Sequence, residues 1–229
     1  MSATADCPLC GTEKVPLFWR QTEGLNFRDV PEIVKSSGEL LFFSCPTCRL
    51  VFKDARAWPA PEMEKRHYLS HENSSGDPRY RAYIERQLQP LLPFLKPGMR
   101  GLDFGCGPAR TLEEIAREKG FECASYDPHF HHEPRVLAQK YDFIVCSESA
   151  EHFYSPMTEF MRLRALLLPK GCIAVLSAWP PENFERWHYH RDPTHVVFYS
   201  EATFDWLARQ LRLSLVKSES GVAILQARS

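Results

Sequence analysis

The sequence predicts an α/β protein in which a doubly wound, mostly parallel sheet follows a small N-terminal module that binds a metal ion. Three observations support this prediction. From residue 98 onward, apolar runs of strand length alternate with helical patterns; a G-x-G loop follows the first run; and two paired-cysteine motifs lie near the N-terminus. We therefore divide the chain into a zinc-ribbon-like module, linking helices and an α/β domain, over residues 1–55, 56–97 and 98–229.

The N-terminal module is predicted from its cysteines, which form two C-x2-C pairs separated by 34 residues: Cys7, Cys10, Cys45 and Cys48. Two such pairs supply the four thiolates of a tetrahedral zinc site. Disulfides are disfavoured because no secretory signal precedes the pairs, and a redox motif is disfavoured because neither pair lies in a βαβ unit. Four thiolates leave no open position for water, so we expect structural zinc, with a longer hairpin or loop over residues 24–39.

The linking segment predicts a short helix followed by a longer one. Asp77 and Pro78 supply an N-cap and a first-turn proline, and apolar side chains then recur at helical spacing up to Leu91. Tyr68 and His71 lie in the polar stretch just before this helix. They are candidates for lining a substrate entrance, although a solvated loop explains them equally well.

The α/β domain is predicted from apolar runs and helix signals in alternation. Strands are expected over residues 100–104, 121–127, 141–148 and 172–178, with a closing hairpin over 213–220 and 222–228. Helices are expected over 111–120, with a Thr111–Glu114 capping box, over 156–167, and over 201–211, where Ser200 is the cap.

The loop Gly105-Cys106-Gly107 is weak evidence by itself. It is not a phosphate-binding loop, because no G-K-[ST] follows, and Arg110 occupies the third glycine position of the dinucleotide fingerprint. An acid, Asp127, ends the second strand, 24 residues after Asp103. A glycine loop after one strand and an acid at the tip of the next indicate a nucleoside site. From these residues alone, a nicotinamide cofactor and S-adenosylmethionine are about equally supported.

In this form the run from Asp103 to Gly107 resembles motif I of the class I S-adenosylmethionine-dependent methyltransferases. The resemblance extends over almost the whole chain. Residues 141–153 are similar to the family's fourth-strand motif, and residues 163–175 to its turn into strand five, with Lys170 in place of the first glycine. Residues 184–208 resemble a late motif of a bacterial subgroup that also carries an N-terminal pair of cysteine knuckles.

This resemblance implies a Rossmann-like methyltransferase fold and S-adenosylmethionine as cofactor. Asp103, Gly105 and Gly107 would surround the methionine portion, and Asp127 would bind the ribose. The predicted cofactor-binding set is completed by Cys106, Pro128, Ser147 and Glu148.

One departure from the family pattern concerns the third strand. Only 13 residues separate Asp127 from Tyr141, whereas a βαβ unit takes about 30. We therefore expect the third strand to be absent and the second strand to lie at the sheet edge. The family's adenine-contacting loop follows that third strand, so His129, Phe130 and the short helix after them would replace it, or adenine is more exposed.

Methyl transfer to an acceptor requires a positioned nucleophile and, where the acceptor carries a proton, a group that removes it. His152 follows the expected strand over residues 141–148, and His195 lies in the loop after the expected strand over residues 172–178. Both are candidate bases, because imidazole titrates near neutral pH. For His195, bracing of its loop with Asp192 as partner is equally open. The long loop over residues 178–197 suggests a lid, and the predicted substrate contacts are Tyr68, His71, Trp187, His188, Tyr189 and Asp192. Histidines 129, 131, 132, 188 and 190 lack carboxylate partners at ligand spacing, so no second metal is expected on them.

Composition limits the remaining function classes. A formal net charge of −1 gives no support for binding a nucleic-acid backbone by bulk electrostatics, although a local basic patch stays open. No apolar run has the roughly 18–20 residues that cross a bilayer, and without a secretory signal we expect a cytoplasmic protein.

The leading hypothesis is methyl transfer to a small or carrier-borne acceptor. An anionic acceptor is suggested by four arginines, Arg162, Arg164, Arg186 and Arg191. The alternatives are an RNA or protein methyltransferase that uses the zinc module for recognition, and a non-catalytic adapter with a vestigial cofactor site.

Overall fold

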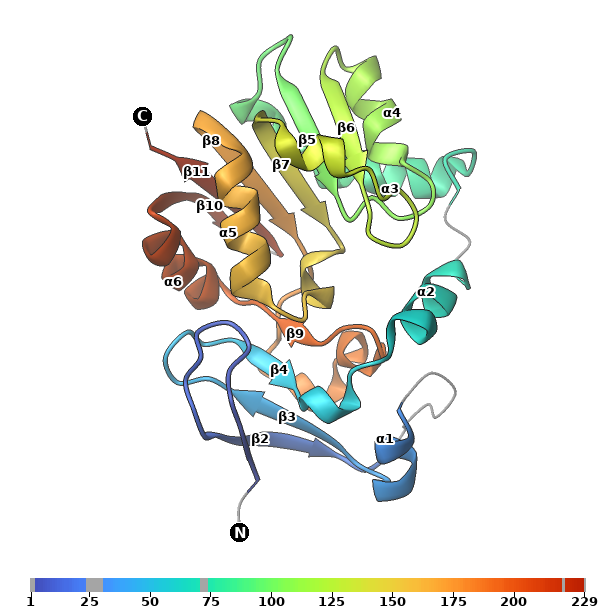
Figure 1. Cartoon of the computed structure of the whole chain (residues 1–229), viewed down its shortest axis with the longest axis vertical. Coiled ribbons are helices and arrows are strands. Elements are labelled where there is room, and N and C mark those ends of the chain that lie inside the picture. Colours follow the sequence, from blue (N-terminus) through green and yellow to red (C-terminus); the bar gives the residue numbers. More distant parts are fainter. Residues whose placement is uncertain (1–2, 24–30, 71–73, 220, 229) are drawn as a thin grey trace.

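The computed structural model describes residues 3–23, 31–70, 74–219 and 221–228, and it contains two β-sheets, a large one above a small one (Figure 1). The predicted substrate residue His71 lies outside the described residues. So do residues 24–30, which form part of the predicted inserted hairpin or loop.

The large sheet has six strands in the order β10-β11-β8-β7-β5-β6. Strands β6, β5, β7 and β8 are parallel, whereas β11 is antiparallel to both β8 and β10. This topology confirms the predicted α/β class, with a mostly parallel sheet. The bounds are β5 (Arg100–Phe104), β6 (Glu122–Tyr126), β7 (Tyr141–Ser147), β8 (Leu167–Leu176), β10 (Leu213–Glu219) and β11 (Val222–Ala227).

Strand β6 lies at the edge of the large sheet, as the short spacing after Asp127 predicts. Residues 127–140, all of which are described, contain one 3₁₀ helix, η3 (Pro134–Ala138), and no strand of this sheet. The chain therefore passes directly from β6 to β7, and the third strand of the family pattern is missing.

Helices cover both faces of the large sheet. Side chains of β7 alternate between the faces, so that Phe143 packs in the cluster with α3 and α4, and Ile144 packs in the cluster with α5 and α6. Figure 1 shows α5 and α6 together on one side of this sheet. The bounds are α3 (Pro78–Leu88), followed by η2 (Leu92–Phe94), then α4 (Thr111–Glu118), α5 (Pro156–Leu166) and α6 (Glu201–Leu211).

The helix starts are mostly those expected. Asp77 caps α3 by accepting a hydrogen bond from the Arg79 amide, and Ser200 caps α6 in a capping box with Thr203. The predicted Thr111–Glu114 capping box is wrong. The N-cap of α4 is Arg110, at a left-handed φ of 49°, and it makes no side-chain cap hydrogen bond.

The small sheet has the strand order β1-β2-β3-β4-β9, and every pair in it is antiparallel. Its last strand comes from the other half of the chain, because β9 lies between β8 and α6 in sequence. We call this β4–β9 pairing the seam; Figure 1 shows β9 between the two sheets. The bounds are β1 (Thr4–Ala5), β2 (Val15–Gln21), α1 (Glu32–Ser37), β3 (Leu40–Ser44), β4 (Val51–Lys53) and β9 (Val197–Phe198).

Two short elements connect the small sheet to α3, namely η1 (Ala55–Ala57) and α2 (Pro61–Leu69). The core is continuous across the two sheets, since one buried cluster contains Cys45 and Phe52 of the small sheet together with Tyr199 and Ile144. The domain boundary at residue 55 stays a prediction. None of the helices in the described parts of the chain is long and apolar enough to cross a membrane.

Candidate functional site

A cavity of about 670 Å³ opens at the carboxyl ends of β5, β6 and β7. Parallel strands present their carboxyl ends at one edge of a sheet, which is where ligands of open α/β sheets bind. Every residue of the predicted cofactor-binding set lines this cavity, and Tyr68, His152, Asp192 and His195 line it as well. The predicted substrate contacts Trp187, His188 and Tyr189 do not.

The glycine loop after β5 forms one wall of the cavity. Gly105 and Gly107 have φ values of 85° and 63°, in the left-handed region that glycine adopts without a steric penalty. A Cβ atom on Gly105 would lie 2.4 Å from the Ser149 Cβ atom, whereas one on Gly107 would meet nothing within 4 Å. Gly105 is therefore required for packing, and Gly107 leaves room for a ligand.

Asp127 joins the glycine loop to the turn after β6. Its Oδ2 atom accepts a hydrogen bond of 3.0 Å from the Gly107 amide, and its Oδ1 atom accepts bonds of 2.8 and 3.1 Å from the amides of His129 and Phe130. The sequence reading assigned this carboxylate to the ribose and did not find its bracing role. Oδ1 already accepts two hydrogen bonds, whereas Oδ2 keeps a lone pair for a ribose hydroxyl, so the two roles are compatible.

Asp103 lies buried at the cavity wall, and it forms no ion pair with any of the described residues. Burial raises the pKa of its carboxyl to about 8, and the neighbouring acids Asp127 and Glu113 add to the increase. A buried acid whose charged neighbours are also acids favours a ligand that carries positive charge.

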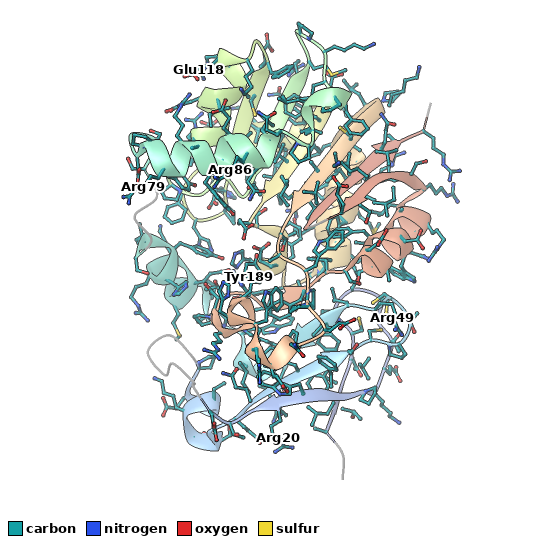
Figure 2. The ribbon with its side chains drawn as sticks, turned by 180° about the vertical axis from the view of Figure 1, so that it is seen from behind. Arg20, Arg49, Arg79, Arg86, Glu118 and Tyr189 are labelled. Atoms are coloured by element: carbon teal, nitrogen blue, oxygen red, sulfur yellow. The ribbon has the colours of Figure 1, made fainter. Side chains whose placement is uncertain are left out.

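Two further carboxyl groups, of Glu148 and Glu151, share one phenol. The Tyr189 hydroxyl lies 2.8 Å from Glu148 Oε2 and also contacts Glu151 Oε1. A phenol has a single hydrogen to donate, so one of the two carboxyls must donate its own proton to the phenol oxygen. Burial raises the pKa of both carboxyls, which agrees with a shared proton. Figure 2 shows Tyr189 between the two sheets, in the segment that precedes β9.

Two imidazoles stand side by side at the same end of the cavity, with ring centroids 4.9 Å apart. His152 Nδ1 lies 2.8 Å from the Thr194 carbonyl oxygen, and His195 Nδ1 lies 2.8 Å from that of Tyr189. A carbonyl only accepts, so each Nδ1 carries the hydrogen and each neutral ring keeps a lone pair on Nε2. Burial lowers the pKa of both rings, to about 3 for His195, where the neighbouring His152 lowers it further.

Asp192 braces the loop that carries His195. Its Oδ1 atom accepts hydrogen bonds from the amide and hydroxyl of Thr194, and its Oδ2 atom lies 3.2 Å from His67 Nε2. The distance from Oδ2 to His195 Nε2 is 3.9 Å, so His67 is the closer partner. The Tyr189 carbonyl, rather than Asp192, orients the His195 ring.

Sequence reasoning missed several residues of this site. Glu64, on α2, accepts a hydrogen bond of 2.7 Å from the Tyr68 hydroxyl and lies 3.2 Å from His129 Nε2. The i,i+4 spacing of Glu64 and Tyr68 was a signal available in the sequence. Lys53, on β4, is buried, and its ammonium donates to the Asp192 carbonyl oxygen. A lysine that ends an apolar run beside a cysteine motif was the only signal for that contact.

The four arginines that suggested an anionic acceptor do not gather at the cavity. Arg162 lines it but pairs with Glu159 at 2.9 Å, and the other three are not part of the lining.

The four cysteines of the N-terminal module converge, with their sulfur atoms all within 4.8 Å of one another. Cys7 and Cys48 are 3.5 Å apart, and Cys10 and Cys45 are 3.4 Å apart. Thiolates bound to one zinc ion at about 2.3 Å would be roughly 3.8 Å apart, so the cluster fits a tetrahedral metal site. The amides of Gly11 and Arg49 close the two knuckles by donating to the carbonyls of Cys7 and Cys45.

Comparison with known proteins finds similarity to methyltransferases along most of the chain. A family model described as a methyltransferase domain matches residues 77–218. One similar solved structure is a 1,6-didemethyltoxoflavin-N1-methyltransferase from Burkholderia thailandensis, at 16% identity and a TM-score of 0.52 over 83% of this chain and 96% of that one. Another is a SAM-dependent methyltransferase from Archaeoglobus fulgidus, at 17% identity and a TM-score of 0.49 over 64% of this chain and 94% of that one. No curated protein sequence matches significantly.

Proposed function

The chain belongs to the class I S-adenosylmethionine-dependent methyltransferases, and from this premise we propose that it methylates a small or carrier-borne acceptor bound in the cavity. The observation that carries the proposal is that one cavity gathers the whole predicted cofactor-binding set and the imidazole pair. Its volume of about 670 Å³ lies within the range of roughly 300–1,000 Å³ typical of small-molecule sites.

The residues that line the cavity suit S-adenosylmethionine in their charge and in the space that they leave. S-adenosylmethionine supplies an electrophilic methyl group on a cationic sulfonium when it is bound. Asp103 would face that positive charge, Gly107 would leave space for close approach, and Asp127 would accept a ribose hydroxyl at the remaining lone pair of its Oδ2 atom. Because β6 is an edge strand, His129 and Phe130 would supply the adenine contacts.

The acceptor would lie near Tyr68 and the imidazole pair. Neutral rings with lone pairs on Nε2 can accept hydrogen bonds from a hydroxyl or an amine. Burial lowers the pKa of both candidate proton acceptors, to about 3 for His195, so each ring is a weaker base than a free imidazole. The acids that line this end of the cavity, Glu64, Glu148 and Asp192, favour an acceptor that donates hydrogen bonds over an anionic one.

The cysteine cluster would hold structural zinc. Its four sulfurs would complete the coordination sphere and leave no position for a substrate. The neutral net charge gives no support to a role for this module in RNA recognition.

Calorimetric titration with S-adenosylmethionine tests the proposal. Wild-type protein should bind with micromolar affinity, and Asp127→Ala and the nearly isosteric Asp103→Asn should each weaken binding at least tenfold. Asp205→Ala is the matched control, because Asp205 is an exposed acid on α6 that pairs with Arg209. Absence of binding by a folded wild-type protein would contradict the proposal and favour the adapter hypothesis.

A further inference from the structure

Three potential metal ligands meet at the acceptor end of the cavity. One ligand atom from each of Glu151, His152 and His195 lies within 4.8 Å of the other two. Glu151 and His152 belong to η4 (Ala150–His152), directly after β7, and His195 follows η6 (His188–Arg191) on the loop after β8. Ligands of one ion, each at about 2.1 Å, lie roughly 3–3.5 Å apart, so side-chain movements of about 1 Å would close the site.

Both imidazoles are oriented in the way that metal-ligating histidines are. Each donates its Nδ1 hydrogen to a backbone carbonyl at 2.8 Å, which fixes the tautomer and leaves the Nε2 lone pair free. The two carbonyls belong to Thr194 and Tyr189, on the same loop as His195. This loop therefore aligns both rings.

Glu151 supplies an independent observation. Its side chain is completely buried, and its Oε2 atom has no hydrogen-bond partner among the described residues. Its carboxyl interacts with Tyr189, Ser177 and Glu148, none of which carries a positive charge. Without an ion, the proton shared with Glu148 offsets the cost of burying two carboxylates, and a metal ion would replace that proton as the positive partner of Glu151. The buried Lys53 directs its ammonium to the Asp192 carbonyl oxygen and not to Glu151.

The cluster also has access to the cavity. His152 and His195 line the cavity, whereas Glu151 lies behind them. An ion held by these three side chains would keep its remaining coordination positions on the cavity side, which is the arrangement of a catalytic rather than a structural metal site. Imidazole and carboxylate ligands suit zinc, manganese and cobalt.

We propose that Glu151, His152 and His195 bind a divalent first-row transition metal ion whose open positions take the oxygen of a hydroxyl-bearing acceptor. This inference rests on the proposed function and specifies its acceptor class. A metal ion lowers the pKa of a hydroxyl bound to it. With both Nε2 lone pairs on the ion, the imidazoles would act as ligands and not as bases, and the hydroxyl proton would pass to solvent water. The ion is separate from that of the cysteine cluster, whose ligands are all sulfur.

Cobalt binding tests the site without an activity assay. Protein that retains the metal of its cysteine cluster is dialysed against Co²⁺, and the metal content per chain and the visible spectrum are measured. We expect one additional ion per chain, with ligand-field bands but no thiolate charge-transfer band. Glu151→Gln and His195→Ala should each weaken this binding at least tenfold.

Matched controls separate the site from surface binding. His188 and Glu185 lie on the same loop region as His195, are exposed and do not line the cavity, so His188→Ala and Glu185→Gln should bind Co²⁺ like wild type. The inference is overturned if wild-type protein takes up no additional ion, or if all four variants bind equally. S-adenosylmethionine titration of the same samples separates the two proposals, because loss of cobalt binding with intact cofactor binding rejects only the metal site.

Discussion

The two sheets are stabilised in different ways. The large sheet has apolar clusters on both of its faces, and most residues of its central strands β7 and β8 are buried. The small sheet has short strands, and one of its sides is organised around four cysteines. Its other side packs against the loop after β8, where Trp19 and Phe42 contact Phe184 and His190.

This difference shows how a sheet that is too small to have its own hydrophobic core is stabilised. About 50 residues bury too little apolar surface for independent stability, so metal ligands or neighbouring elements have to contribute. In the small sheet β9 completes the edge, and the knuckles present four sulfurs that we propose bind zinc. The loop that covers it also carries Asp192 and His195, so the small sheet supports one wall of the cavity.

The largest expected effect comes from breaking the cysteine cluster. Cys48→Ser removes one of four thiolates, and zinc binding to such sites contributes about 10–16 kcal/mol in isolated fingers. Strands β2, β3 and β4 of the small sheet should lose their hydrogen-exchange protection, while β5 and β7 keep theirs. Cys146→Ser, in the large sheet, is the control for loss of a thiol, and it should leave the metal content unchanged. Equal loss of protection in both sheets of Cys48→Ser would contradict the comparison.

The next largest effect, on the free energy of unfolding, is expected from the packing of the loop after β8 against the small sheet. Phe184 is 4% exposed, and Phe184→Ala should lower the free energy of unfolding by about 3–5 kcal/mol. The neighbouring Phe18 is 48% exposed, so Phe18→Ala should lower it by less than about 1 kcal/mol. Denaturant unfolding measures both. Similar values for the two variants would mean that the loop contributes little to holding the small sheet.

Lys53, at the seam, gives a pH dependence whose change in stability per pH unit is the smallest of the three effects. Burial lowers the pKa of its ammonium to about 7, so between about pH 7 and pH 10 the unfolded chain binds the proton that the folded chain has lost. Stability should therefore rise with pH across this window, by at most about 1.4 kcal/mol per pH unit. Thermal unfolding of Lys53→Met should lack this increase, whereas the exposed Lys65 is a control position whose Lys65→Met variant should keep it. An unchanged pH profile in Lys53→Met would show that the ammonium is not the titrating group.

The large sheet could be predicted because its signals are local. Each strand is an apolar run, each helix but one begins at the cap that the sequence indicates, and 13 residues after Asp127 leave no room for another strand. The exception is α4. Arg110 adopts a left-handed conformation that its residue type disfavours, and it pairs with Glu113 at 3.0 Å, which no local pattern predicts.

Of the residues that line the cavity, the sequence could predict only those that follow a strand in the chain. The glycine loop, Asp127 and His152 follow strands directly, so the parallel topology brings them together. Contacts formed by distant segments, such as Glu64 with His129 or Lys53 with Asp192, depend on tertiary packing. Strand β9 has two residues and follows a polar loop, so its pairing with β4 had no signal in the sequence.

The seam also sets an order for biosynthesis. Strand β4 leaves the ribosome early, but its partner β9 follows only after nearly 150 further residues have been made. Until then the open edge of β4 exposes unpaired backbone groups next to the apolar Val51 and Phe52, a surface prone to pairing with other chains. N-terminal segments generally fold first during synthesis, but here the first segment is completed almost last. We therefore expect that edge to stay open to other chains until the loop after β8 has been made.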